Sequence, residues 1–73
     1  MKTIEANIRV TINGDERQIR GGQTVADLLT ALDLHPRLVV VEHNREILDR
    51  TLYDRIEVHD GDMLELVHFV GGG

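Results

Sequence analysis

A single short helix with one apolar face is the feature that most constrains this chain. Thr24 is a favourable helix N-cap, and Asp27 stands three residues later, as in a capping box. The apolar positions after the cap repeat at helical spacing: Val25, Leu28, Leu29 and Leu32. Pro36 prevents any continuation. The pattern predicts a helix over residues 25–33 whose one apolar stripe must be buried against a sheet.

The segment before this helix has the pattern of a β-hairpin. Apolar and polar residues alternate over residues 8–12, which is typical of a half-buried strand. Asn13-Gly14 follows, and this dipeptide is the strongest short hairpin signal because both residues tolerate positive φ. Residues 16–19 are predicted to return as the second strand, before Gly21-Gly22 interrupts it.

The segment after the helix contains three more candidate strands. The continuous apolar run over residues 38–41 is typical of a strand covered on both faces. A turn at 43–45 precedes a short strand over 46–48, and residues 51–57 are compatible with a short helical turn. The tight turn Asp60-Gly61-Asp62 leads into the last strand, over residues 63–70.

This order of elements predicts an α+β protein with the β-grasp fold, in which a small mixed sheet of four to five strands curls around one helix. In that fold the last strand lies centrally, beside the first. We therefore expect residues 1–70 to form the domain and residues 71–73 a flexible glycine tail that leaves a firmly held strand.

Composition excludes several classes of function. The 73 residues are enough for one domain and leave little room for an enclosed active site, so an enzyme is disfavoured. The net charge of −5 disfavours nucleic-acid binding, which relies on Lys and Arg. There is no cysteine and no apolar run long enough to span a membrane. We expect a soluble, cytoplasmic protein.

The glycines Gly71, Gly72 and Gly73 are the candidate reactive segment. Without Cβ atoms they can lie in a narrow slot and let another protein approach closely. A carboxylate on Gly73 is ionised at neutral pH and resists nucleophilic attack, so it must be activated, for example as an acyl-adenylate. The chain has no P-loop pattern to hold ATP. We therefore expect no bound cofactor and a partner enzyme that consumes ATP.

Side chains of the last strand alternate between two faces. Leu64 and Leu66 are expected to meet the helix, with His68 on the same side. Val67 and Phe69, like Met63 and Glu65, would lie on the outer face beside the tail, where an exposed apolar patch would dock a partner. A neighbouring loop could instead cover them, and the sequence leaves open which of residues 39–41 joins that face.

No metal site is predicted. The four histidines, at positions 35, 43, 59 and 68, show no paired spacing and read as solvated or turn residues. Asp60-Gly61-Asp62 lacks the remaining acidic positions of a calcium loop and reads as a structural turn.

Taken in order, several short segments resemble the sulfur carrier proteins of thiamine biosynthesis, in the ubiquitin-like β-grasp superfamily. The resemblance covers nearly the whole chain. Its segments are residues 12–14, 24–29, 39–44, 60–62 and 67–73. Arg45 departs from the pattern, since the family often has Gly after Asn at this turn.

The resemblance implies a mechanism and a set of partners. An adenylating enzyme of the ubiquitin-activating type would adenylate Gly73, with Gly72 as the slender approach to it. Sulfur from a cysteine desulfurase or another persulfide donor would displace AMP and leave a thiocarboxylate. Thiazole synthase would take this sulfur into the thiazole ring, and the chain would be a protein cosubstrate.

Other readings stay open at this point. A sulfur carrier could serve another pathway, such as molybdopterin synthase, cysteine or methionine synthesis, or tRNA thiolation. The tail is also compatible with a ubiquitin-like protein modifier. A regulatory or RNA-binding β-grasp module has similar turns, but it does not need terminal glycines and the acidic charge disfavours it.

Overall fold

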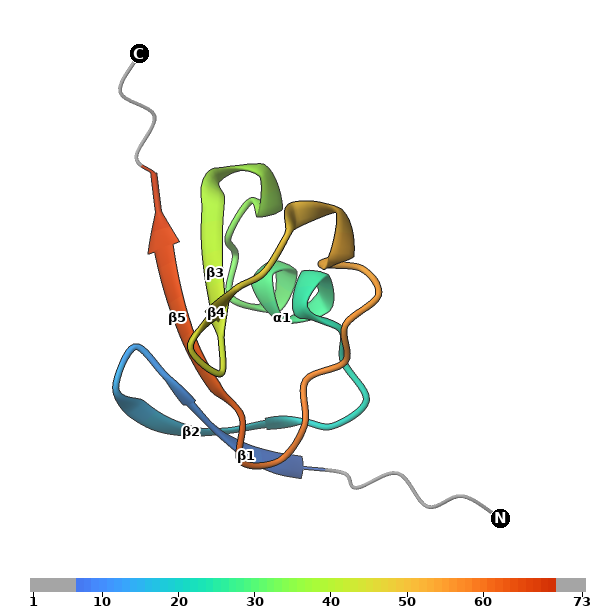
Figure 1. Cartoon of the computed structure of the whole chain (residues 1–73). Coiled ribbons are helices and arrows are strands. Elements are labelled where there is room, and N and C mark those ends of the chain that lie inside the picture. Colours follow the sequence, from blue (N-terminus) through green and yellow to red (C-terminus); the bar gives the residue numbers. More distant parts are fainter. Residues whose placement is uncertain (1–6, 70–73) are drawn as a thin grey trace.

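The computed structural model describes residues 7–69 and shows a curled sheet with one helix against it (Figure 1). The sheet contains β1 (Asn7–Ile12), β2 (Asp15–Arg20), β3 (Val39–His43), β4 (Glu46–Ile47) and β5 (Met63–His68). The α-helix is α1 (Val25–Ala31), and two short 3₁₀ helices are η1 (Pro36–Leu38) and η2 (Arg50–Leu52). None of the helices among these residues is long and apolar enough to cross a membrane.

The strand order is β2-β1-β5-β3-β4, which confirms the predicted β-grasp fold with β5 in the centre. β5 runs parallel to β1 and antiparallel to β3, whereas β2 and β4 are the hairpin partners at the two edges. The last strand is therefore held from both sides over part of its length.

The first hairpin forms as predicted because its turn residues accept left-handed backbone. Asn13 has φ 50° and Gly14 has φ 85°, and the register places Ile12 opposite Asp15. Two positive φ values in a two-residue loop match the right-handed twist of the flanking strands.

The helix begins at its predicted cap and ends earlier than predicted. The Thr24 side chain accepts from the N–H of Asp27 at 3.1 Å, and the Asp27 carboxylate accepts from the N–H of Thr24 at 3.0 Å. The helix stops at Ala31, not at residue 33, because Asp33 adopts φ 61°. The N–H of Leu34 then donates to the carbonyl of Leu29 at 2.8 Å, which closes the end as a Schellman motif.

The core lies between the helix and one face of the sheet. Its fully buried side chains come from the helix, the three inner strands and the loop before β5: Val10, Val25, Leu28, Leu29, Val39, Val41, Val58 and Leu64. The prediction that residues 38–41 form a strand covered on both faces is wrong. Val40 is only partly buried, because the sheet carries a covering layer on the helix side alone among residues 7–69.

Strand limits differ slightly from the predictions. β3 starts at Val39, because Leu38 belongs to η1, and it extends to His43, the first residue of the predicted turn. The predicted helical turn within 51–57 is the 3₁₀ helix η2, which begins one residue earlier. β5 ends at His68, although the N–H of Phe69 still donates to the carbonyl of Leu38 at 2.8 Å.

Candidate functional site

The central strand β5 delivers the chain to the predicted reactive glycines. Residues Gly71, Gly72 and Gly73 lie outside the described residues, so their role stays a prediction. Figure 1 shows β5 running along β3 and ending at the edge of the sheet from which the chain continues. The candidate site therefore consists of the end of β5 and the surfaces next to it.

The two faces of β5 differ in exposure as the alternation predicts. Leu64 is 0% exposed and Leu66 is 9% exposed on the helix side, whereas Val67 and Phe69 are each 54% exposed. No loop of the described chain covers them. The register places Val40 directly opposite Val67, so Val40 is the residue of the 39–41 run that joins the outer face. We call Val40, Val67 and Phe69 the tail-proximal patch; its role as a docking site stays a prediction.

One end of β5 is held by a side chain that sequence reasoning missed. β1 pairs with β5 only at Thr11–Met63 and Ile12–Leu64. Beyond these pairs, the Asn13 side chain forms the hydrogen bonds that a neighbouring strand would otherwise make. Its Oδ1 accepts from the N–H of Leu66 at 2.7 Å, and its Nδ2 donates to the Leu66 carbonyl at 3.2 Å. Asn13 thus closes the hairpin turn and also anchors β5.

Tyr53 performs a similar task on β3. Its hydroxyl accepts from the N–H of Val41 at 3.1 Å and donates to the carbonyl of Val39 at 2.8 Å. Tyr53 is 4% exposed, so this contact replaces water at two buried backbone groups. The strand that pairs with the tail-proximal end of β5 is therefore fixed on its other side.

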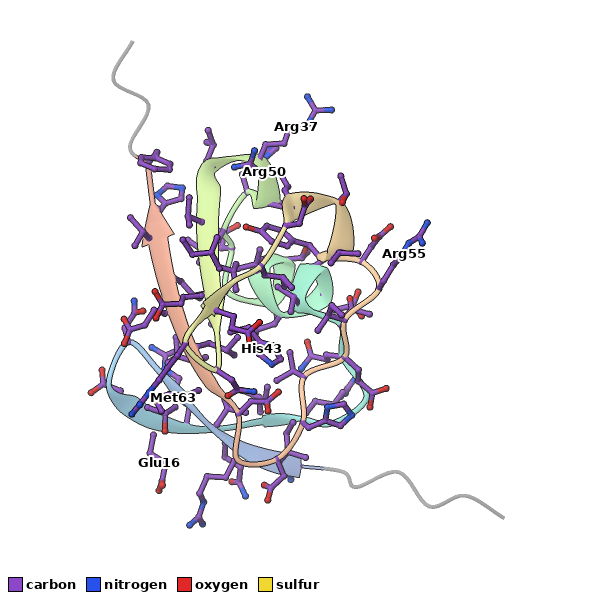
Figure 2. The ribbon with its side chains drawn as sticks, in the orientation of Figure 1. Glu16, Arg37, His43, Arg50, Arg55 and Met63 are labelled. Carbon is purple, nitrogen blue, oxygen red and sulfur yellow. The ribbon has the colours of Figure 1, made fainter. Side chains whose placement is uncertain are left out.

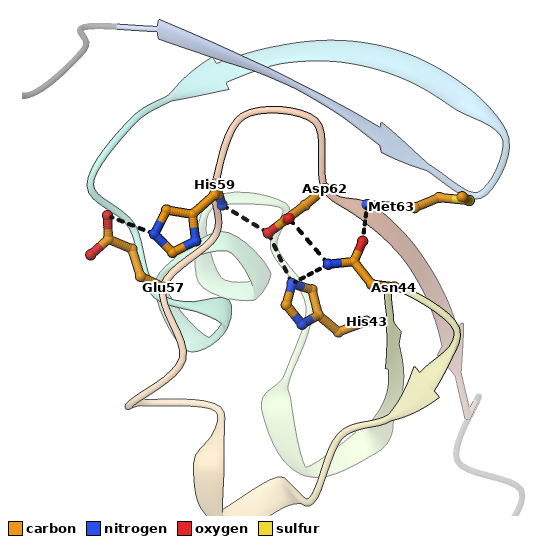
Figure 3. A network of polar contacts seen from close by, with 6 residues as sticks. All are labelled: His43, Asn44, Glu57, His59, Asp62 and Met63. Carbon is orange, nitrogen blue, oxygen red and sulfur yellow. Dashed lines mark hydrogen bonds and ion pairs between the residues drawn. The ribbon is translucent and has the colours of Figure 1, made fainter.

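A third support links the β3–β4 turn to the start of β5 (Figure 3). Nε2 of His43 lies 2.8 Å from Oδ2 of Asp62, and Nδ2 of Asn44 donates to Oδ1 of Asp62 at 3.2 Å. The N–H of His59 donates to the same carboxylate at 2.8 Å, and Oδ1 of Asn44 accepts from the N–H of Met63. We call His43, Asn44 and Asp62 the turn clasp.

The turn clasp changes the protonation of its carboxylate. Burial raises the pKa of Asp62, but hydrogen bonds from His43, from the N–H of His59 and from Asn44 outweigh burial and hold the pKa below its usual value. His43 was predicted to be a solvated or turn residue, and this is wrong, because its side chain is only 19% exposed. The predicted structural turn at Asp60-Gly61-Asp62 is confirmed, with Gly61 at φ 88°.

Charged side chains lie near the tail-proximal patch. Glu42 lies directly opposite Glu65 in the β3–β5 register. This pair is two residues along the strands from the Val40–Val67 pair of the tail-proximal patch. Figure 2 shows Arg37 and Arg50 at the end of the molecule where β5 ends. Among the described residues no three His, Asp or Glu side chains gather as metal ligands. The arrangement can display an apolar surface at the end of β5 to another protein.

The sheet order and the central last strand identify the structural class of this protein. A mixed sheet in the order β2-β1-β5-β3-β4 around one helix, with a central last strand that leads into glycines, is a ubiquitin-like β-grasp domain. Comparison with known proteins is more specific. The model of the ThiS family matches residues 10–73. The chain belongs to the ThiS family.

Individual relatives agree with this assignment. The chain is 46% identical over 50 residues to the sulfur carrier protein ThiS of Bacillus subtilis, covering 68% of this chain and 76% of that protein. The crystal structure of a thiamine biosynthesis protein (ThiS) from Geobacter metallireducens superposes with a TM-score of 0.76 at 38% identity, covering 90% of this chain and 100% of the other.

A second kind of relative is much longer. The chain is 44% identical over 66 residues to a thiazole synthase of Paramagnetospirillum magneticum, covering 90% of this chain. It spans only 20% of the length of that protein, and the same share of a thiazole synthase from Magnetococcus marinus.

Proposed function

We propose that this chain is a sulfur carrier protein of thiamine biosynthesis and acts as a cosubstrate, not as a catalyst. The observation that carries the proposal is the ThiS family match, which extends through Gly73. The fold supports it, because a central strand held by neighbours on both sides leads directly toward the glycines.

In the proposed reaction the carboxylate of Gly73 attacks the α-phosphate of ATP on an adenylating enzyme and releases pyrophosphate. A persulfide sulfur, from a cysteine desulfurase or another donor, attacks the acyl-adenylate, and AMP leaves. The product is an acyl disulfide between Gly73 and the donor. A thiol then attacks the donor's sulfur and breaks the S–S bond, which leaves a thiocarboxylate on Gly73 and a disulfide between the donor and the thiol. The chain itself holds no cofactor, and ATP is consumed on the partner.

Thiazole synthase is the proposed acceptor of the sulfur. In two relatives a segment similar to this chain forms part of a protein named thiazole synthase. This association supports a direct functional link between the carrier and that enzyme. Gly71 and Gly72 would let Gly73 reach a reaction centre, and the tail-proximal patch would hold the folded domain at its entrance.

The test is the intact mass of the chain after incubation with the adenylating enzyme, ATP, cysteine and a desulfurase. We expect a mass increase equal to replacement of one oxygen by sulfur. Deletion of Gly73, or addition of an alanine after it, should abolish the change. Circular dichroism should show the same fold and melting temperature for all three proteins, because no described core residue depends on the tail. Normal thiocarboxylate formation on the extended variant would contradict the proposal, and attachment of the chain to another polypeptide would identify a modifier.

A further inference from the structure

One part of the β5 backbone has no strand beside it within the described residues. The N–H of Phe69 donates to the Leu38 carbonyl at 2.8 Å, so the backbone groups of Phe69 face β3. Because these groups alternate in direction along a strand, those of His68 face the opposite edge. β1 occupies that edge only as far as Leu64, and in Figure 1 β5 continues past the β1–β2 hairpin.

Two other gaps in the pairing of the inner strands are closed by side chains. The Asn13 amide satisfies both backbone groups of Leu66, and the Tyr53 hydroxyl satisfies one group each of Val39 and Val41. Within residues 7–69 no side chain forms such a bond to the backbone of His68. An unpaired strand edge is a template for a further strand.

A groove lies beside this edge on the helix side of the sheet. Its volume is about 300 Å³, and the apolar part of its lining comes from Ile12, Leu32, Leu34 and Leu66. Arg17 and His68 also line it. Leu32 and Leu34 pack against the core but remain partly exposed. A strand added to β5 would direct every second side chain toward the helix side, and therefore into this groove.

Charge indicates what kind of segment would fit. Arg17 is exposed on β2 and takes part in none of the three ion pairs found among residues 7–69. A carboxylate on the added segment could form a hydrogen-bonded ion pair with this guanidinium. An apolar side chain with an acidic one two positions away, on the same face of the added strand, would complement both parts of the groove.

We propose that the β5 edge at His68 accepts an extended segment of the adenylating enzyme by strand addition. The segment places an apolar side chain against Leu32 and Leu34 and a carboxylate at Arg17. This inference rests on the proposed function, since it names the protein that takes up the chain end. Pairing at His68 would hold the last residue of β5 in a defined direction as the glycines enter the enzyme.

The first test compares His68→Pro with His68→Ala in ATP–pyrophosphate exchange by the adenylating enzyme. Proline removes the one N–H that the added strand needs, and it is tolerated where that N–H does not serve the existing sheet. We expect the KM for the Pro variant to rise about three- to tenfold, the usual effect of one lost hydrogen bond, and the Ala variant to stay near the wild type. Equal KM values for the two variants would overturn the inference. If the wild type itself is not adenylated, the proposed function fails instead.

Hydrogen exchange of the wild-type chain tests the same contact without a substitution. The His68 amide should exchange rapidly in the free chain and at least about tenfold more slowly with saturating enzyme, whereas amides on the open edge of β2 should change little. Unchanged exchange at His68 in the complex would contradict strand addition. Protection that depends on the concentration of the chain alone would mean that two copies pair, and would also overturn the proposed occupant.

Charge reversal tests the groove. Arg17→Glu should raise the KM for adenylation about threefold more than Arg20→Glu, which makes the same charge change on the same strand away from this groove. Equal effects of the two reversals would show that general electrostatic attraction, and not a contact at Arg17, accounts for the change.

Discussion

Among residues 7–69, Arg45 is the residue whose backbone conformation least suits its type. Two hairpin loops in this sheet have positive φ at both positions: Asn13-Gly14, and Asn44-Arg45 with φ 51° and 72°. Turns of this type favour Asn-Gly, because an L side chain other than Asn or Asp pays a steric cost in the left-handed region. The first loop has the preferred pair, and the second carries Arg where Gly would fit without strain.

Replacement of Arg45 by Gly should therefore stabilise the protein. We expect the free energy of unfolding to rise by about 0.5–1 kcal/mol, because relief of the left-handed strain exceeds the extra entropy of Gly in the unfolded chain. Arg45→Ala, which keeps the Cβ atom, should bring no such gain. Urea denaturation of both variants measures the difference, and an equal change in the two would rule out backbone strain as the cause.

At the scale of elements, the turn clasp joins two segments that local patterns treat as separate turns. His43 ends β3, Asn44 begins the hairpin turn, and Asp62 precedes β5. The Asp62 carboxylate accepts hydrogen bonds from both other members and from the backbone of His59. It must be ionised to accept all of them well, which is why its pKa is held low despite burial.

This coupling predicts a pH-dependent contribution to stability. A carboxylate with a lower pKa in the folded state stabilises the fold above its unfolded pKa of about 3.9, and the contribution is lost as the pH falls through the folded value. Asp62→Asn should therefore lower the free energy of unfolding at neutral pH, and its deficit relative to the wild type should shrink below about pH 4. Denaturation curves at several pH values measure this difference.

Asp62→Asn must be compared with a control variant, because Asp62 is not the sole carboxylate whose pKa is lowered in the folded state. The pKa of Asp49 is also lowered, mainly by a hydrogen bond from the Thr51 hydroxyl and to a smaller extent by one from the Thr51 N–H. Asp54→Asn is the matched control, since Asp54 is exposed and its carboxylate accepts no hydrogen bond within residues 7–69. A deficit for Asp62→Asn that stays constant down to pH 3 would contradict the assignment.

At the scale of the whole molecule, the fold separates a buried face of β5 from a face available to partners. The sheet has the helix on one side, and the tail-proximal patch lies on the other, at the end from which the chain continues. Val40 and Val67 are direct cross-strand neighbours, so these two residues of the patch belong to the sheet and not to a loop. A partner that binds the chain end can contact this surface at the same time.

Substitution of Val67 by Ser should weaken binding to the adenylating enzyme without unfolding the protein. We expect Kd to rise roughly tenfold, which corresponds to about 1.4 kcal/mol. Met63→Ser is the control, because Met63 is also exposed on the outer face of β5, about 13 Å further from the tail. Calorimetric titration of both variants measures the effect. Equal losses at both positions would show that the patch near the tail has no special role.

The sequence by itself determined the elements, their order, the central place of the last strand and the inward face of β5. These follow from local periodicity and turn chemistry, which need only neighbouring residues. Tertiary structure alone decided which polar side chains complete the sheet: Asn13 reaches Leu66 across 53 positions, and His43 reaches Asp62 across 19. It also decided that Val40 faces outward and that the His68 backbone lacks a partner among the described residues. Such contacts depend on strand register and on where one strand ends beside another. They join residues that are far apart in the sequence, and a pattern of neighbouring residues does not encode them.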